Sequence, residues 1–359
     1  MGPNRLLTLL LTVTLIASAC SGADEATAPV DDESSSTVSA SGTAASQSTS
    51  ASASEPTDDP TTTTAAPADD EPAPAPTTIP DAPVIFDGER IVAIGSNVWP
   101  IVGDLLSVGV TPVAIYSQLG NQEQPDYITE AYGEQLADVP VTYLNIAEIS
   151  PEDILQLAPD RVVMPEFFRN LINANPVWSE VLAEDGAAVY IPVRNWQGSL
   201  GALADAAGES ADGAIAELQV IYDDRIAAIA ASLDYDPTSV RFNTFQWNED
   251  GTYLPTLADA PIVQIARELG FEIHESLSPD ISPPLSQETV TDMDADIVFI
   301  QVRNVEFDTL STDPLWSLTG AAQRGNTFER FQFGQQAGWL ETLELLDLLA
   351  EALPRYQAG

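Results

Sequence analysis

Few residues of this chain could carry out covalent or metal chemistry. The 359 residues include one cysteine, Cys20, and one histidine, His274, and every one of the 12 basic residues is an arginine. A lone cysteine cannot close an intrachain disulfide, and a lone histidine removes most metal and acid–base schemes. The 55 acidic residues are so abundant that choosing two of them as a catalytic pair would be arbitrary.

Short catalytic motifs are also missing from the sequence. It contains no G-x-S-x-G, no P-loop, no H-E-x-x-H and no G-x-G-x-x-G. We therefore expect a binding protein, not an enzyme. A secreted hydrolase, which a turnover assay would reveal, is one alternative. An adhesion or structural surface domain is another, and small ligands would not stabilise it against heat.

Three alternating aspartates, Asp292, Asp294 and Asp296, resemble a calcium loop at first sight. However, Ile297 stands where an EF-hand needs glycine at its sixth position. We interpret the triplet as the junction between a helix and a strand. The stretch Asn248–Gly251 is typical of a hairpin or loop turn.

Cys20 follows an apolar run that has the features of a secretory signal. Arg5 supplies a short positive region, and residues 6–19 are apolar and end in small side chains. The run is too short for a membrane span. Its last residues, Ala17 to Cys20, resemble the lipobox of bacterial lipoproteins, which implies cleavage before Cys20 and a lipid on its sulfur. A soluble secreted protein with an incidental cysteine is the alternative.

Composition divides the rest of the chain. Residues 20–82 are mostly Ser, Thr, Ala, Pro, Asp and Glu, and such a stretch cannot bury enough apolar surface to offset its ordering entropy. We expect a disordered, extended tether there.

The formal net charge of −43 argues against nucleic acid as a partner, because phosphates need a basic footprint on the protein. It fits a solvated surface in extracytoplasmic surroundings.

Helical and strand-like segments alternate from residue 83 onward, which favours parallel α/β units. One long segment interrupts the alternation, because its apolar residues recur at steps of three and four and predict an uninterrupted amphipathic helix. These residues are Ile215, Leu218, Tyr222, Ile226, Ile229 and Leu233. The predicted class is α/β, with two Rossmann-like lobes joined by one long helix and a ligand cleft between the lobes. The expected divisions are a signal peptide at 1–19, the tether at 20–82, lobes at 83–208 and 235–359, and the helix at 209–234.

Four segments in the α/β region carry a resemblance to a known family. They are ISPEDILQLAPDRVVM (149–164), LSQETVTDMDADIVFI (285–300), DPLWSLTGAAQRGNTFER (313–330) and Trp339 at the head of the last helix. In this order they resemble the helical-backbone (class III) periplasmic substrate-binding proteins of ABC transporters, which serve iron–siderophores, haem and cobalamin.

The resemblance implies a lipid-anchored extracytoplasmic receptor that captures a ferric siderophore and delivers it to a permease dimer with its ATPase. Haem and cobalamin are alternative ligands of the same fold. We expect a monomer without a cofactor of its own. In the family, one glutamate on each lobe pairs with permease arginines, and Glu152 and Glu288 occupy the matching segments. The helix dipole alone would also favour an acid at both positions.

Ligand-binding residues are expected where parallel strands end, because open α/β lobes bind ligands at the carboxyl ends of their strands. Guanidinium groups suit oxygen-rich anions, and aromatic rings suit the flat faces of a chelate. Each arginine could instead pair with a carboxylate, and each tryptophan could belong to a core, as we expect for Trp178 and Trp316. The candidates are Trp99, Tyr116, Arg194, Trp196, Trp247, Tyr253, Arg303, Phe333 and Trp339.

Overall fold

The structure is a computed structural model that describes residues 85–117, 124–144, 148–182, 187–277, 283–303, 305–330 and 336–358. Cys20, the expected signal peptide and tether, and Phe333 lie outside the described residues. We call residues 85–208 the N-terminal lobe and residues 235–358 the C-terminal lobe.

A five-stranded parallel sheet, in the order β3-β2-β1-β4-β5, forms the centre of the N-terminal lobe. In the middle of the sheet, Val92 of β1 lies opposite Ala114 of β2 and Val162 of β4. Val92 and Ile94 contribute to the core on one face and Ala93 to the core on the other, because successive side chains of a strand alternate. The strands are β1 (Ile91–Gly95), β2 (Ala114–Ser117), β3 (Val141–Tyr143), β4 (Arg161–Pro165) and β5 (Ala188–Ile191).

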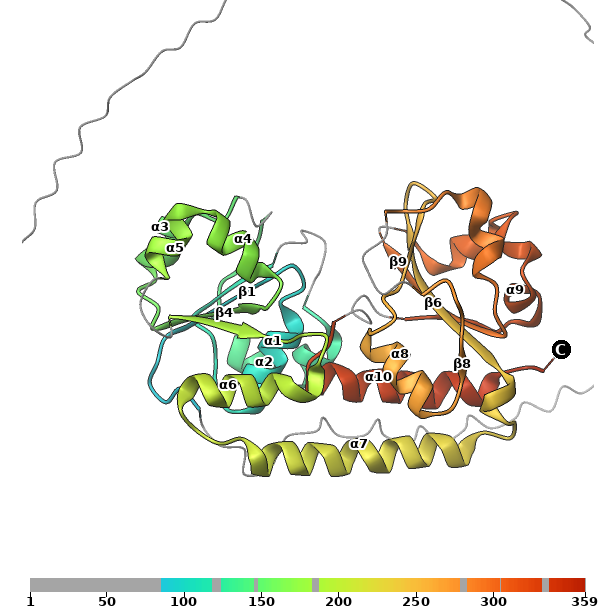
Figure 1. The fold of residues 1–359 in the computed structure, drawn as a ribbon, viewed down its shortest axis with the longest axis horizontal. Helices are drawn as coiled ribbons and strands as arrows, with labels where there is room; N and C mark the ends of the chain where they lie inside the picture. The colour runs from blue at the N-terminus through green and yellow to red at the C-terminus, as the bar shows by residue number, and fades with distance from the viewer. Residues whose placement is uncertain are drawn as a thin grey trace, which may run out of the picture. The chain divides into compact units, whose positions relative to one another are not determined.

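Helices cover both faces of this sheet, which explains why β1 is apolar throughout (Figure 1). One face carries α1 (Trp99–Ser107), α2 (Asp126–Leu136) and α6 (Ser199–Ala207), with the 3₁₀ helix η2 (Trp196–Gly198) before α6. The other face carries α3 (Pro151–Gln156), α4 (Phe168–Ala174) and α5 (Pro176–Val181). Helix α3 begins with a side-chain cap, because the Ser150 hydroxyl accepts the Asp153 N–H at 3.4 Å and Pro151 is the first helical residue.

A single helix, α7 (Asp212–Ser232), leads from the N-terminal to the C-terminal lobe (Figure 1). Its apolar face is the predicted one. Leu218, Tyr222 and Ile229 are buried, and Ile215, Ile226 and Leu233 pack partly buried against the same core.

The C-terminal lobe contains a second five-stranded sheet. Its strands follow the order β10-β9-β6-β7, and β8 pairs with the start of β6. All pairings are parallel except that of β6 with β7, which form a hairpin. The strands are β6 (Arg241–Asn248), β7 (Tyr253–Pro255), β8 (Glu272–Ile273), β9 (Ile297–Arg303) and β10 (Thr327–Glu329).

Short helices surround this sheet, and one long helix closes the chain. The α-helices are α8 (Pro261–Glu268), α9 (Gly320–Arg324) and α10 (Trp339–Ala352). The 3₁₀ helices are η3 (Pro237–Ser239), η4 (Gln287–Met293), η5 (Phe307–Thr312), η6 (Trp316–Leu318) and η7 (Leu353–Arg355). The predicted α/β class, with two lobes joined by a long helix, is confirmed.

Helix α10 links the two lobes a second time, because it packs against α7 and α1 (Figure 1). Just before α10, the N–H of Ala337 donates to the carbonyl of Val193 in the N-terminal lobe at 3.0 Å. Along the helix, Arg225 of α7 donates to the Asp347 carboxylate at 2.8 Å. One hydrophobic cluster consequently runs through both lobes.

The two polar segments that the sequence marked as structural have that role. The N–H of Gly251 donates to the Asn248 carbonyl at 2.9 Å, and Gly251 has a φ of 78°, which closes the β6–β7 turn. Asp294 accepts the N–H groups of Gly320 and Ala321, at 2.7 and 3.0 Å, at the start of α9. The triplet thus joins η4 to β9, and the described residues contain no group of three or more metal-ligating side chains.

No helix among the described residues combines the length and the apolar character that a membrane crossing requires.

Candidate ligand-binding site

The N-terminal sheet has one position where neighbouring strands are connected in opposite directions. From β1 the chain first adds β2 and β3 on one side and later returns to add β4 and β5 on the other. In open α/β sheets, ligands bind outside the carboxyl ends of the strands at such a switch point. The residues that follow β1 and β4 are therefore the first place to search for a site.

Several aromatic side chains and one arginine follow β4 at this switch point. Phe167 is 43% exposed, unusually high for a phenylalanine, and its ring meets that of Phe168 edge-on at 4.8 Å. The guanidinium of Arg169 lies 4.4 Å from the ring centroid of Tyr190 in β5, which is a cation–π geometry. Its ion pair with Glu166, at 3.9 Å, is solvent-exposed and thus weak.

The sequence prediction missed Phe167 and Arg169, although the rule that selected the other candidates also applies to them. Both residues lie just after β4, whose run of apolar and β-branched residues is typical of a strand.

In the C-terminal lobe the corresponding switch point lies between β6 and β9. Their last residues, Asn248 and Arg303, are partners in the parallel register. Both line a pocket of about 560 Å³, a volume within the usual range for ligand sites. The remaining lining residues are Glu249, Asp250, Thr252 and Pro284.

Arg303 is exposed, and its guanidinium has no ion pair or side-chain hydrogen bond with any residue that the structure describes. The nearby acid Asp250 is already engaged, because its carboxylate accepts the hydroxyl of Thr252 at 2.6 Å and the N–H at 2.9 Å. These hydrogen bonds lower the pKa of Asp250, so it stays ionised. The pocket therefore offers one unengaged cation together with two carboxylates, Glu249 and Asp250, and hydrogen-bonding side chains.

The other predicted arginine is held differently. Arg194 follows β5 and forms an ion pair with Asp259 at 3.8 Å, while its carbonyl accepts the Gln264 side chain at 3.2 Å. Both partners belong to the C-terminal lobe, so Arg194 lies where the lobes touch.

Three of the predicted tryptophans are buried in the shared core. Trp99, Trp196 and Trp339 are each at most 2% exposed. Trp196 meets Trp339 edge-on at 4.6 Å and Tyr222 of α7 at 4.8 Å. The structure brings these rings together as packing partners, and contact with a ligand stays a prediction for each.

The other aromatic candidates lie on different faces. Trp247 and Tyr253 are buried in the β6–β7 hairpin, and the Tyr253 hydroxyl is hydrogen-bonded to Thr289 at 2.8 Å. Tyr116 is half-buried in β2, and burial, with the charge of Asp153 adding, raises its pKa. Trp178 and Trp316 are buried, as the core assignment expected.

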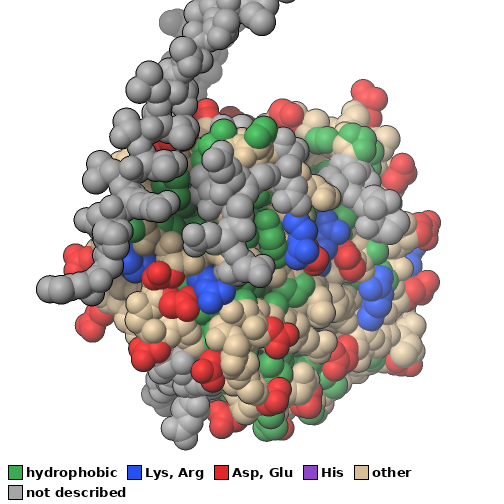
Figure 2. Space-filling model, turned by 60° about the vertical axis from the view of Figure 1, so that its left-hand side comes forward, with side chains coloured by type: hydrophobic (Ala, Val, Ile, Leu, Met, Phe, Trp, Pro, Cys, Tyr) green, Lys and Arg blue, Asp and Glu red, His purple; other side chains and the backbone are tan. Residues whose placement is uncertain are grey.

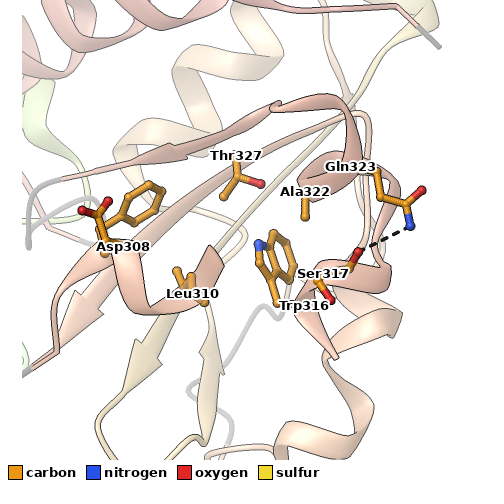
Figure 3. A pocket seen from close by; sticks show the side chains of 8 residues that line it. Asp308, Leu310, Trp316, Ser317, Ala322, Gln323 and Thr327 are labelled. Carbon is orange, nitrogen blue, oxygen red and sulfur yellow. Dashed lines mark hydrogen bonds between the residues drawn. The ribbon is translucent and has the colours of Figure 1, made fainter. Parts of the chain in front are cut away.

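A second pocket, of about 260 Å³, lies among η5, η6, α9 and β10 (Figure 3). Leu310 and Trp316 make its wall largely apolar, and the Thr327 hydroxyl is a buried group with no partner among the described residues. Because it lies beside the start of β10 and offers no arginine, it is a poorer match to an anion site than the Arg303 pocket.

The two glutamates with a predicted docking role are both exposed at helix starts. Glu152 lies in the first turn of α3, where its carboxylate accepts the Ser150 hydroxyl at 2.8 Å. This hydrogen bond lowers the pKa of Glu152. Glu288 lies in the first turn of η4. The helix that contains Glu288 is therefore a 3₁₀ helix.

Acidic side chains are spread widely over the surface. Figure 2 shows Asp and Glu over much of the visible face, with arginine at several places across its middle.

Comparison with known proteins adds a likeness in structure but none in sequence. No protein-family model matches the chain, and no curated protein sequence matches it. The triscatecholate siderophore binding protein FeuA of Bacillus subtilis, solved with ferri-bacillibactin, superposes with a TM-score of 0.58 at 16% identity. The match covers 73% of this chain and 91% of FeuA. The chain has the fold of these binding proteins.

Two further solved structures show the same likeness. SirA of Staphylococcus aureus matches with a TM-score of 0.58 at 17% identity, over 75% of this chain and 100% of SirA. IsdE of S. aureus, solved with heme, matches with a TM-score of 0.52 at 15% identity, over 74% of this chain and 98% of IsdE. At such identities the likeness establishes the two-lobe fold, and the ligand has to be argued from this chain's own residues.

Proposed function

We propose that this chain is the substrate-binding protein of an ABC importer and that it captures a ferric siderophore outside the cytoplasm. The observation that carries the proposal is the agreement between the fold and Arg303. The chain has the two-lobe architecture of siderophore-binding proteins over nearly their whole length, and its unengaged arginine lies at the strand ends where that architecture binds ligands.

The chemistry of the two switch points suits an anionic chelate. Catecholate and carboxylate siderophores present negatively charged oxygens, which guanidinium groups bind through charge-assisted hydrogen bonds. Arg303 in one lobe and Arg169 in the other supply such groups, and Phe167 and Tyr190 supply aromatic faces. We infer that the ligand contacts both sets.

In this proposal the protein binds its ligand and does not convert it chemically. We propose a monomer without a resident cofactor, held at the membrane by a lipid on Cys20, that passes its ligand to a permease dimer and its ATPase. The likeness to transporter binding proteins supports a role in capture over one in catalysis.

Haem is the second candidate, supported by the likeness to IsdE. Haem iron needs an axial ligand, for which His274, Tyr116 and Tyr253 are the candidates. His274 and Tyr253 are both buried, and the Tyr253 hydroxyl is bonded to Thr289. Their burial favours a siderophore over haem and leaves the half-buried Tyr116 as the remaining candidate.

Thermal unfolding with a panel of ligands tests the proposal. We expect Tm to rise with a ferric catecholate or carboxylate siderophore, because a ligand that binds only the native state stabilises it. The same siderophores without iron, haem and cobalamin provide the comparison. A shift with haem or cobalamin alone would select the alternative ligand, and no shift with any of them would overturn the proposal.

A further inference from the structure

Two acidic side chains lie inside the molecule at the first turn of α10. Asp104 of α1 and Glu341 of α10 are each only 1% exposed. They come from segments more than two hundred residues apart, and α10 belongs to the chain that follows the C-terminal sheet. Nothing in the proposed capture of a ligand requires either group.

Several buried polar atoms of these two acids and of the neighbouring Tyr127 and Arg330 have no partner among the residues that the structure describes. They are Asp104 Oδ2, both carboxylate oxygens of Glu341, the Tyr127 hydroxyl and Nη1 of Arg330. Arg330 is 1% exposed and uses its other nitrogens on hydroxyls, with Nε 2.8 Å from Thr244 Oγ1 and Nη2 3.1 Å from Thr256 Oγ1. It therefore makes no direct ion pair with either acid.

The contact between α1 and α10 is closely fitted around Asp104. Its Oδ1 accepts the N–H of Trp339, the first residue of α10, at 2.8 Å. A side chain at the preceding Gly338 would place a Cβ 2.5 Å from Asp104 Oδ1 and 2.6 Å from the Pro100 carbonyl. Asp104 thus caps α10 from another helix, and the absence of a side chain at Gly338 allows it to do so.

Two ionised carboxylates are unfavourable at such a place. A buried charge without a hydrogen-bonded partner is strongly destabilised, and a buried acid ordinarily avoids that state by keeping its proton. One arginine, itself held by threonines, cannot compensate two negative charges. A carboxylic acid that keeps its proton still accepts the Trp339 N–H through its carbonyl oxygen.

We propose that Asp104 and Glu341 form a proton-loaded joint between the N-terminal lobe and α10. At neutral pH the pair carries at least one proton. Loss of that proton weakens the packing of the first turn of α10 against α1.

The surrounding charges support this assignment. Burial raises the pKa of Asp104 to about 7, although the nearby Ser199 side chain and the hydrogen bond from the Trp339 N–H lower it. The Ser199 hydroxyl itself donates to the Trp196 carbonyl, at 2.7 Å, so it leaves Asp104 Oδ2 without a partner. Burial and the neighbouring Asp104 raise the pKa of Glu341 well above its ordinary value, and only Arg330 acts in the other direction.

The other titratable groups around the joint are mostly acids or phenols. From α2 these are Tyr127, Tyr132 and Glu130, and from α10 they are Glu344 and Asp347. Burial raises the pKa of Glu344 to about 6, while Arg225 of α7 counteracts the effect. Neither phenol supplies a positive charge, so Arg330 and Arg225 are the cations that face this group among the described residues.

The direction of the pH effect follows from the raised pKa values. Between the ordinary carboxyl pKa of about 4 and the folded-state value, the native protein binds more protons than the unfolded chain. The stabilisation from Asp104 is therefore complete below about pH 4. It declines as pH rises towards 7 and changes no further above that pH. The contribution of Glu341 declines over a range that extends beyond pH 7, because its pKa is raised further.

Hydrogen exchange of the purified full chain between pH 5 and 8 tests the proposal. In the peptide 336–346, corrected for intrinsic exchange, we expect the opening equilibrium to rise up to about tenfold per pH unit below pH 7. Replacing both acids with amides, Asp104→Asn with Glu341→Gln, removes the titrating groups but keeps the oxygen that accepts the Trp339 N–H. The pH dependence should flatten in that variant.

Glu351→Gln is the matched control, because Glu351 lies on the same helix with its side chain 79% exposed. The control should keep the wild-type profile. A double variant that retains the wild-type pH dependence, or a wild-type profile already flat, would overturn the proposal.

Infrared spectroscopy of the wild-type protein gives a readout that does not depend on how the variants fold. A carboxylic acid of the joint should give a C=O stretching band that persists above pH 6, where Glu344 loses its proton, and weakens as the pH is raised to 9. A spectrum in which every carboxyl group is ionised at pH 6 would rule out a proton on the joint.

Discussion

The arginines of this acidic protein divide into two groups by what they contact. Arg161, Arg225 and Arg324 pair with Glu89, Asp347 and Asp296 at 2.9, 2.8 and 3.6 Å. Carboxylates outnumber arginines heavily in this chain, so such partners are readily available. Arg303 belongs to the arginines without an ion pair to a described residue, and its guanidinium is exposed beside the strand ends.

Arg303→Ala should weaken the binding of an anionic ferric siderophore by about 1.5–3 kcal/mol, the contribution of a hydrogen bond to a charged group. Isothermal titration measures the change. Arg355→Ala is the control, because Arg355 is an exposed arginine that pairs with Glu351 at the other end of α10. Equal affinity of the Arg303 variant and the wild type would remove this residue from the site.

At the scale of elements, the aromatic residues of η2, α7 and α10 hold the two lobes together. Trp196, Tyr222 and Trp339 come from these three elements, and their rings are in direct contact. The Tyr222 hydroxyl also donates to Glu268 of α8 at 2.6 Å. Tyr222 thus ties the middle of α7 to both lobes, so we expect this helix to limit movement between them.

Trp196→Ala should reduce the free energy of unfolding by about 3–5 kcal/mol, because it leaves a cavity in a packed core. Urea denaturation monitors the change. Val220→Ala, on the exposed face of α7, should alter stability by no more than about 0.5 kcal/mol. If the Trp196 variant instead kept its stability and lost siderophore affinity, the ring would be a ligand contact and not a core residue.

For the molecule as a whole, the shared core has a consequence for motion. A hydrophobic cluster continues from the N-terminal sheet through α7 and α10 to the C-terminal sheet. Opening the lobes widely would expose part of that cluster to water, which is unfavourable in proportion to the apolar area uncovered. We therefore expect ligand binding to change the angle between the lobes only slightly.

Membrane attachment is predicted to depend on Cys20. Cys20→Ala should release the protein into the soluble fraction, because two or more acyl chains give stable anchoring and the variant cannot carry them. Cell fractionation and immunoblotting measure this. Recovery of the variant in the membrane fraction, resistant to salt and alkaline washing, would contradict a lipid anchor at this residue.

Transfer to the importer is predicted to depend on one glutamate of each lobe. Glu152→Arg combined with Glu288→Arg should abolish iron uptake by cells and leave siderophore affinity intact, because like charges would then meet at the permease, at several kcal/mol. The loss of transport is measured as the uptake of radioactive iron by cells that contain equal amounts of the variant and the wild-type protein.

Glu217→Arg combined with Asp224→Arg is the charge-matched control, since both acids lie on the exposed face of α7. The control should transport normally. Normal uptake by the Glu152 and Glu288 variant as well would show that docking depends on other residues.

The sequence by itself determined those features of this protein that depend on local periodicity and local chemistry. The steps of three and four in residues 215–233 predicted α7, because a helix face involves only neighbouring residues. The cap of α3 by Ser150 is equally local. The same holds for the turn at Gly251 and for the alternation of strands with helices.

The tertiary structure decided everything that depends on which distant segments meet. The same rule of aromatic and arginine residues after strands applies to Trp99, Trp196 and Arg303, yet packing buries the two tryptophans and leaves the arginine at a pocket. Asp104 and Glu341 look like ordinary members of an acidic sequence. Only the contact between α1 and α10 removes them from water, and burial, which no local pattern encodes, is what holds a proton on them.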